Sequence, residues 1–341
     1  MPKSSFTLAL VGATGEVGRA ALDAIDQLEL PLAAFRAFAS PRSAGETVQV
    51  GDDEVRVAAL SEAGFRGCDV ALFCAGADVS REWAPKAWAA GCAVVDTSPA
   101  FRADPDVPLV VPEVNPDALA GFRARGVVAS PGATAIALSV ALAPLRAAAG
   151  VERIVVTTYE AVSGAGRGGV AALEREARDL LGLREPEPAA HFPHRIAFNL
   201  IPQIGPFLEG GATEAEDALA RETRRVLGEP SLGVAATAVR VPVFYGDAAA
   251  VTVTTRRKLS AAEARAALRG APGVKLVDDL AQGVYPMPML AAAEDAVLVG
   301  RVRDDPSQEK GLALFAVVEG TRKGGATNAL QLARLLAERY L

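Results

Sequence analysis

Apolar runs alternate with helix-like segments along the first third of the chain. Between the first two runs, Val17, Ala21, Ile25 and Leu28 recur at gaps of four, four and three residues, which is the spacing of one helix face. Short apolar strands separated by helices are typical of a parallel sheet, so the pattern predicts a doubly wound α/β domain. The predicted strands are Phe6 to Val11, Ala34 to Ala39, Val70 to Phe73, Ala93 to Val95 and Val127 to Ala129.

The pattern changes after Pro131, where a helix is predicted from about Thr134 to Ala148. The strands that follow are longer and rich in β-branched residues, which indicates a mixed or antiparallel sheet and an α+β second domain. A last helix is predicted from Asn328 to Tyr340. The strands of the second domain are expected at Ile154 to Thr158, Ala235 to Val243, Ala249 to Thr255 and Leu312 to Val318.

Length and charge narrow the class of protein. A chain of 341 residues, half of them hydrophobic, is long enough for two domains with their own cores. The formal net charge is -6, and lysine and arginine are scattered without a basic stripe, so no nucleic-acid partner is expected. The N-terminus lacks the long apolar segment of a secretory signal, so we expect a cytoplasmic protein.

Neither a membrane-spanning segment nor a metal centre is expected from the sequence. The uncharged stretch from Gly126 to Leu145 is interrupted by prolines and a glycine, so a strand, a turn and a buried helix fit better than a membrane span. Only two histidines occur, which excludes a His-rich metal centre. The cysteines match neither a zinc site nor a CxxC pair, and they are Cys68, Cys74 and Cys92.

Gly12, Gly15 and Gly18 form a GxxGxxG pattern between a predicted strand and a predicted helix. This spacing lets the backbone approach a pyrophosphate at the helix N-terminus, as in a Rossmann-type dinucleotide site, and makes Thr14, Glu16 and Val17 candidate contacts. A tight structural turn is the alternative interpretation of the same glycines.

The end of the second predicted strand carries Ser40, Arg42 and Ser43. An NAD-specific site usually has an acidic residue there for the ribose 2′-hydroxyl, whereas a cation and two hydroxyls suit a 2′-phosphate. The pattern therefore predicts NADP rather than NAD. Arg42 as an exposed loop cation is the alternative.

Six motifs occur in a fixed order from about Phe6 to Tyr340, and together they resemble the aspartate-semialdehyde dehydrogenase family. The resemblance implies a discontinuous NADP-binding domain, residues 1–131 and 322–341, and a substrate-binding and dimerisation domain, residues 132–321. It also implies a homodimer formed through the second domain. The motifs are GATGEVG at 12–18, SPRSAG at 40–45, VPEVN at 111–115, FNLIPQ at 198–203, RVPV at 240–243 and RKGGATN at 322–328.

The resemblance also implies binding residues. Gly76, Ser163, Gly164 and Asn328 match family positions that approach the cofactor. A small carboxylate or phosphate ligand is expected at positions that match the family's phosphate-binding arginine, its Glu/Lys pair and its carboxylate-binding arginine. These positions hold Arg102, Glu222, Arg225 and Arg240, and Arg225 replaces a lysine, which keeps the charge but changes the donor geometry.

The catalytic positions depart from the family pattern. In the family a cysteine thiolate forms a thioester that NADPH reduces, and this needs a nucleophile and a nearby base. Here Ala133 stands at the cysteine, after Gly132 at the family's asparagine. Glu160 replaces an orienting glutamine, and Asp247 replaces the base histidine. A Gly-Asp turn without a catalytic role is the alternative interpretation of Asp247.

These departures predict a catalytically silent, NADP-binding relative. The alternative is an active NADP-dependent oxidoreductase. It would interconvert L-aspartyl 4-phosphate and L-aspartate 4-semialdehyde in lysine, methionine and threonine biosynthesis, with Thr134 or Cys74 as a substitute nucleophile. A carbonyl reductase that needs no covalent step is a further alternative.

Overall fold

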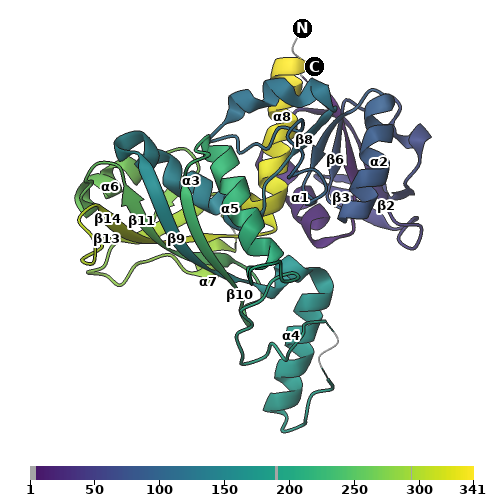
Figure 1. Cartoon of the computed structure of the whole chain (residues 1–341). Coiled ribbons are helices and arrows are strands. Elements are labelled where there is room, and N and C mark those ends of the chain that lie inside the picture. Colours follow the sequence, from purple (N-terminus) through teal and green to yellow (C-terminus); the bar gives the residue numbers. More distant parts are fainter. Residues whose placement is uncertain (1–4, 189–190, 293) are drawn as a thin grey trace. The chain divides into compact units, whose positions relative to one another are not determined.

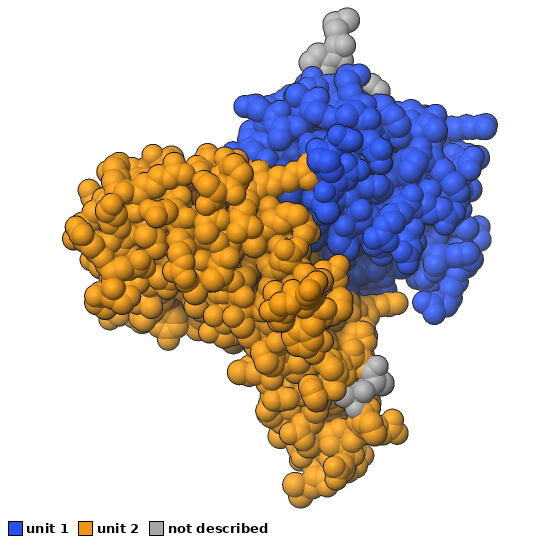
Figure 2. Space-filling view, viewed as in Figure 1, with its two compact units in different colours: residues 1–132, 324–341 blue, residues 133–323 orange. Residues whose placement is uncertain are grey.

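The computed structural model describes residues 5–188, 191–292 and 294–341. The chain divides into two compact units, drawn in blue and orange in Figure 2. Unit 1 contains Met1–Gly132 and Gly324–Leu341, and unit 2 contains Ala133–Lys323.

Unit 1 is built on a parallel sheet, as the alternating pattern predicted (Figure 1). Its strand order is β5-β2-β1-β6-β7-β8, and every pairing in it is parallel. The strands are β1 (Phe6–Val11), β2 (Leu32–Ala39), β5 (Ala58–Ala59), β6 (Val70–Phe73), β7 (Ala93–Asp96) and β8 (Val127–Ala129). A hairpin of β3 (Thr47–Val50) and β4 (Asp53–Arg56) stands apart from this sheet.

Helices pack against the sheet of unit 1 because its strands are apolar on both faces. Leu8, Leu10 and Leu72 share one buried cluster with residues of the first and last helices, such as Ile25 and Leu330. The second helix contacts β6 and β7. These helices are α1 (Glu16–Gln27), α8 (Thr327–Tyr340) and α2 (Ala77–Ala89), with shorter helices η1 (Glu62–Phe65) and η2 (Pro116–Ala124).

Unit 2 contains a mixed sheet, which confirms the second part of the predicted fold class. Its strand order is β10-β9-β11-β14-β13-β12, with parallel pairs at both ends and antiparallel pairs between them. The strands are β9 (Val151–Glu160), β10 (Gly233–Arg240), β11 (Asp247–Thr255), β12 (Val274–Leu276), β13 (Val297–Asp304) and β14 (Gly311–Val318).

Helices α3 (Ala133–Ala149), α5 (Glu214–Leu227) and α6 (Ala261–Leu268) pack against this sheet, and α3 also contacts α5 and α6. Helix α4 contacts η3 and extends away from the sheet (Figure 1). Among the helices of the described residues, none is long and apolar enough to cross a membrane. The helices of unit 2 are α3 (Ala133–Ala149), η3 (Val162–Ala165), α4 (Gly166–Leu181), α5 (Glu214–Leu227), α6 (Ala261–Leu268) and α7 (Pro288–Ala291), and the short π-helix η4 (Arg322–Ala326) leads into α8.

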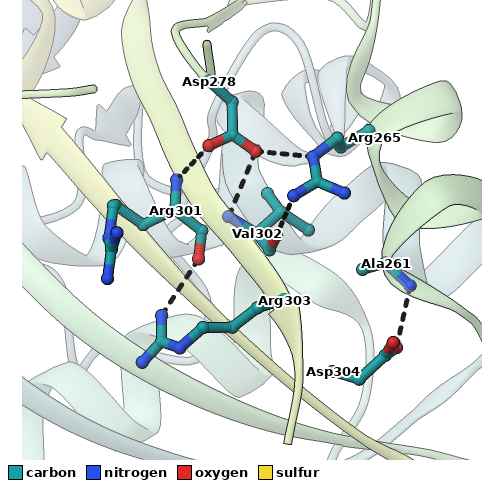
Figure 3. A network of polar contacts seen from close by, with 7 residues as sticks. All are labelled: Ala261, Arg265, Asp278, Arg301, Val302, Arg303 and Asp304. Atoms are coloured by element: carbon teal, nitrogen blue, oxygen red, sulfur yellow. Dashed lines mark hydrogen bonds and ion pairs between the residues drawn. The ribbon is translucent and has the colours of Figure 1, made fainter. Parts of the chain in front are cut away.

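A buried aspartate holds an irregular part of this sheet (Figure 3). The pairing of β13 with β14 shifts register between Gly300 and Arg303, so the local backbone donors need another acceptor. Asp278 supplies it, because its carboxylate accepts the N–H groups of Arg301 at 2.8 Å and Val302 at 3.2 Å. The guanidinium of Arg265 lies 2.7 Å from the same carboxylate.

Candidate cofactor and substrate sites

Close backbone contacts require glycine at two positions of the turn between β1 and α1. Gly12 has a φ of +89°, and an ideal Cβ there would lie 2.6 Å from the carbonyl oxygen of Cys74. A Cβ on Gly18 would lie 2.1 Å from the carbonyl oxygen of Gly12. Larger residues are therefore excluded at both positions by backbone packing alone. The turn also leaves the N-terminus of α1 open, with Gly15 as its N-cap.

A cavity of about 520 Å³ lies at the carboxyl ends of β1, β2 and β6. In doubly wound sheets this end, next to a helix N-terminus, is where nucleotides bind. The sequence did not single out its apolar walls, Leu60, Val79 and Trp83, because apolar residues between strands carry no functional signal of their own. The predicted cofactor residues that line the cavity are Gly12, Thr14, Gly15, Ser40 and Gly76.

The remaining predicted cofactor residues lie elsewhere. Glu16 and Val17 form the first turn of α1, and Arg42 and Ser43 lie in the turn that follows β2. Arg42 is exposed, and the structure records no ion pair between it and a described residue. Asn328 is buried at the start of α8.

The Asn328 side chain forms hydrogen bonds through its amide nitrogen but not through its amide oxygen. Its Nδ2 donates to the carbonyl oxygen of Val110 at 3.2 Å and to Ser130 Oγ at 2.9 Å. Its Oδ1 is buried and has no hydrogen-bond partner among the described residues. A buried acceptor without a donor costs free energy, so this oxygen is a candidate contact for a ligand amide or hydroxyl.

In unit 2, Ala133 and Asp247 both lie beside Gly320. Ala133 is the first residue of α3, and Asp247 is the first residue of β11. An ideal Cβ on Gly320 would lie 2.7 Å from Asp247 Oδ2 and 3.8 Å from Ala133 Cβ. The two substituted catalytic positions are thus brought together, although they are more than a hundred residues apart in the sequence.

Glu160, Arg240 and Asp247 form one buried polar cluster. Arg240 and Glu160 are register partners on the parallel strands β10 and β9, and Arg240 Nη2 lies 4.0 Å from Glu160 Oε2. Arg240 Nη1 donates to the carbonyl oxygen of Ala161 at 2.6 Å, and Ala161 N–H donates to Asp247 Oδ1 at 2.8 Å. Thr158 Oγ1 donates to Glu160 at 3.1 Å.

Burial dominates the ionisation of the two carboxyl groups in this cluster. The pKa of Asp247 is raised to about 7, chiefly by burial and also by the neighbouring charge of Glu160, against the opposing effects of the Ala161 N–H and of Arg240. The pKa of Glu160 is raised by burial as well, against the effect of Arg240. Asp247 is therefore a group that can hold a proton near neutral pH.

Glu319 is a third carboxylate of this cluster, and sequence reasoning missed it. It is 2% exposed, its charge acts on Asp247, and its own pKa is raised by burial. Its Oε2 accepts from Thr321 Oγ1 at 2.8 Å and from the N–H of Arg322 at 2.5 Å. Its position three residues before the RKGGATN motif was the available signal.

The other predicted binding residues lie on separate elements. Arg102, in unit 1, donates from Nε to the carbonyl oxygen of Ser130 at 2.9 Å and from Nη2 to that of Thr97 at 2.5 Å. Glu222 and Arg225 are three residues apart on α5 and so share one helix face.

Ser163 and Gly164 belong to η3. A Cβ on Gly164 would lie 2.9 Å from Arg240 Nη1, so glycine is needed for this close approach.

The substitute nucleophiles receive little support. Burial raises the pKa of the Cys74 thiol to about 12, which disfavours the reactive thiolate. Thr134 is the second residue of α3. No group of three or more His, Cys, Asp or Glu side chains is placed to hold a metal ion in the described ranges of the chain.

A parallel nucleotide-binding sheet joined to a mixed-sheet unit defines a class of two-domain NAD(P)-dependent oxidoreductases. Residues 7–122 match the family model described as semialdehyde dehydrogenase, NAD binding domain, and residues 142–323 match semialdehyde dehydrogenase, dimerisation domain. The chain belongs to the aspartate-semialdehyde dehydrogenase family, which confirms the resemblance seen in its motifs.

The relatives match the chain over its length. An aspartate-semialdehyde dehydrogenase of Aquifex aeolicus is 43% identical over 337 residues, which cover 98% of this chain and 99% of that protein. The crystal structure of aspartate semialdehyde dehydrogenase II from Vibrio cholerae, complexed with ASA, is 42% identical with a TM-score of 0.96, covering 99% of this chain and 100% of that one. A probable aspartate-semialdehyde dehydrogenase from Pseudomonas aeruginosa is 34% identical with a TM-score of 0.93, covering 99% and 100%.

Proposed function

We propose that this protein binds NADP(H) and a small ligand but does not carry out the phosphorylating oxidation of aspartate semialdehyde. The observation that carries the proposal is the pair Ala133 and Asp247 beside Gly320. At the place where the family needs a thiol and an imidazole base, this chain has a methyl group and a buried carboxyl group. A methyl group cannot form a thioester, and removing the nucleophile of an unrelated hydrolase lowers turnover by about a million-fold.

The preference for NADP over NAD is part of the proposal. It is supported by the cavity at the carboxyl ends of β1, β2 and β6, where Ser40 is a lining residue. Arg42 lies two residues further along, exposed and without a recorded carboxylate partner among the described residues, so its guanidinium is available to a 2′-phosphate.

We also propose a homodimer formed through unit 2, acting in the cytoplasm. The sheet of unit 2 leaves Val155 37% exposed on β9, the second strand of the sheet, while Tyr159 and Phe315 on the same face are only partly buried. An apolar sheet face of this kind is typical of a surface that a second copy covers. Light scattering at tens of micromolar tests it: the mass of a dimer supports the interface, and the mass of a monomer refutes it. The cytoplasm is supported by the three free, buried thiols.

The proposed absence of the phosphorylating oxidation is tested by recording a progress curve in a mixture of the protein with aspartate semialdehyde, phosphate and NADP. No NADPH above background is expected from the purified chain, while an active relative run in parallel shows that the reagents work. Calorimetric titration of NADP on the same sample shows that the protein is folded and able to bind. Phosphate-dependent turnover by the unmodified chain would overturn the proposal.

Direct reduction of a carbonyl group is a second candidate, favoured by one observation. Because the pKa of Asp247 is raised to about 7, this group can donate a proton to a carbonyl oxygen, and NADPH, when bound, would supply the hydride. The product would be an alcohol, and no covalent intermediate is needed. Oxidation of NADPH by aspartate semialdehyde without phosphate, lost in Asp247→Asn, would establish this reaction; an unchanged NADPH signal excludes it for this substrate.

A further inference from the structure

Cys68 and Cys92 lie side by side at the start of two neighbouring strands of unit 1. They immediately precede Asp69 and Ala93, and the N–H of Ala93 donates to the carbonyl oxygen of Asp69 at 2.9 Å, next to the parallel pair β6 and β7. Neighbouring strands lie about 4.8 Å apart, and a disulfide spans Cα atoms separated by about 4.4 to 6.8 Å. The backbone at this end of the sheet therefore has the spacing that a disulfide needs.

The two sulfur atoms contact the same turn of η1. Cys92 Sγ donates to the carbonyl oxygen of Phe65 at 3.2 Å, and Cys68 Sγ lies 3.7 Å from the carbonyl oxygen of Gly64. Gly64 and Phe65 are consecutive residues, and each thiol is also a hydrogen-bond partner of the other. Both thiols are free in this structure. The pair thus consists of two reduced cysteines in contact with each other.

An exposed cation lies beside this pair. Arg36 Nη1 donates at 2.8 Å to the carbonyl oxygen of Gly64, the same oxygen that Cys68 contacts. The contact with Cys92 lowers the pKa of the Cys68 thiol to about 7, and Arg36 acts in the same direction, against burial and the charge of Asp69. The pKa of Cys92 is raised by the same contact and by burial. Cys68 is therefore the thiol of the pair that ionises near neutral pH, and the thiolate is the nucleophilic form.

Cys74 offers a comparison from the opposite end of β6. It is 9% exposed, and burial raises the pKa of its thiol to about 12. Cys68 is 4% exposed and Cys92 is fully buried. Exposure alone would make Cys74 the first thiol to react with an oxidant, whereas thiolate character favours Cys68.

We propose that Cys68 and Cys92 form an oxidation site, in which a small peroxide converts the two thiols into a disulfide. A thiolate with a second thiol in contact is the arrangement in which oxidation ends at a disulfide and goes no further. The pair lies at the amino ends of β6 and β7, whereas the cofactor cavity lies at the carboxyl ends of β1, β2 and β6. The inference goes beyond the proposed function and does not depend on it.

The reaction balances with one peroxide for each pair. The Cys68 thiolate attacks one peroxide oxygen, the O–O bond breaks, and the departing hydroxide takes up the proton that the thiol released, which gives water and a sulfenic acid. Cys92 then attacks the Cys68 sulfur, so that an S–S bond replaces the S–O bond. The departing hydroxide leaves with the Cys92 thiol proton as a second water. The two sulfur atoms together lose two electrons, and the peroxide gains them.

The probe is hydrogen peroxide, added in slight excess to the reduced full chain at neutral pH. The protein is then denatured, alkylated and digested with trypsin, which releases residues 67–81 and 87–102 as separate peptides. We expect these peptides to be joined by a disulfide that dithiothreitol reverses, with Cys74 alkylated. Fragment ions separate Cys68 from Cys74, because both lie in the first peptide. Alkylation of all three cysteines, or a disulfide through Cys74, overturns the proposal, and this experiment requires no variant.

Variants of the pair identify which thiol attacks. In Cys92→Ser the sulfenic acid on Cys68 has no thiol to react with, so dimedone is expected to trap it. In Cys68→Ser we expect no label on Cys92 over the same time, because its thiol is buried and its pKa is raised. Melting curves show whether each variant is folded. Labelling of Cys92 in Cys68→Ser without labelling of Cys68 in Cys92→Ser contradicts the assigned order.

Arg36→Gln tests the cation. We expect disulfide formation to slow by about threefold, the effect of about half a pKa unit on the thiolate fraction. Arg66→Gln is the control, because Arg66 is exposed and lies on the same segment as Gly64. A turn loosened by the loss of the Arg36 hydrogen bonds would expose Cys68 and speed the reaction, so a slower rate is not a sign of local unfolding. An unchanged or faster rate in Arg36→Gln, or equal slowing in Arg66→Gln, overturns the role of Arg36.

Discussion

Asp247 accepts a hydrogen bond at 2.8 Å from the backbone N–H of Ala161, the residue that follows β9. The bond links the first residue of β11 to the end of its antiparallel neighbour. Asp247 is thus part of the sheet architecture as well as of the candidate site. A carboxyl group that accepts a buried backbone N–H on one oxygen and lies against Gly320 with the other therefore has a structural role in the sheet.

The raised pKa of Asp247 predicts how stability changes with pH. The pKa is about 7 in the folded chain and 3.8 ordinarily, so between these values the folded state binds more protons than the unfolded state. The free energy of unfolding therefore falls as pH rises from about 4 to 7. The full penalty is present above 7, and at 1.36 kcal/mol per pKa unit it is at most about 4 kcal/mol.

Asp247→Asn removes this penalty and keeps an oxygen that can accept the Ala161 N–H. The difference in unfolding free energy between variant and wild type is expected to shift in favour of the variant between pH 4 and pH 8. Urea denaturation at several pH values measures it. Asp106→Asn, at an exposed aspartate, is the control for the loss of one charge. A pH-independent difference for Asp247→Asn would show that burial does not perturb this group.

From the position of Arg42 we predict that the protein binds NADP more tightly than NAD. If its guanidinium pairs with the 2′-phosphate, Arg42→Ala should weaken NADP binding by about tenfold, the effect of roughly 1.4 kcal/mol, and leave NAD binding unchanged. Arg339→Ala, at an exposed position of α8, is the control. Titration of both dinucleotides decides the matter. Equal weakening of NADP and NAD, or a preference for NAD in the wild-type chain, would remove the 2′-phosphate from the interpretation.

We predict that replacing Asp278, which lies outside the candidate site, lowers the free energy of unfolding. Its side chain is 1% exposed and accepts from Arg301, Val302 and Arg265, so Asp278→Ala leaves buried donors without an acceptor. A loss of about 3 kcal/mol is expected. Asp304→Ala is the comparison, because Asp304 accepts only the Ala261 N–H at the start of α6, a contact worth about 1 kcal/mol. Equal losses in urea titrations would contradict the role of Asp278 in holding the bulge.

The sequence predicted the sheets because their signals are local. The alternation of Leu8 and Leu10 with residues of the opposite face, and the helix spacing of Val17 and Ile25, depend only on near neighbours in the chain. The ends of strands were less well placed: β9 extends to Glu160, two residues beyond the predicted end at Thr158. That extension matters because it puts Glu160 in register with Arg240.

The candidate site was only partly predictable, because its contacts join residues that are far apart in the sequence. Motif positions identified Ala133, Glu160 and Asp247, but the Ala161 to Asp247 hydrogen bond joins residues 86 positions apart. Such a contact follows from sheet pairing and not from local spacing. Glu319 lies three residues before the RKGGATN motif, but that position does not reveal its burial next to Asp247, from which its importance comes. Asp278 was missed likewise, since only the bulge in β13 creates its donors.

Restoring the cysteine alone should not restore the reaction of the family. In Ala133→Cys the thiol would lie near Asp247, and a negative charge nearby disfavours the thiolate. One charge at about 4 Å, with an effective dielectric constant near 20, contributes about 4 kcal/mol at most, or about three pKa units. A thiol shifted that far is almost entirely protonated at neutral pH. Near-background turnover is therefore expected for the single variant.

The triple change Ala133→Cys, Glu160→Gln, Asp247→His should regain measurable NADP reduction, because it restores the nucleophile and base while removing two negative charges. Phosphate-dependent formation of NADPH from aspartate semialdehyde is the readout, and each single change serves as a control. Gly132→Asn is a fourth change to add if the triple variant binds NADP but turns over slowly. Full activity from Ala133→Cys alone would show that Glu160 and Asp247 do not suppress the chemistry.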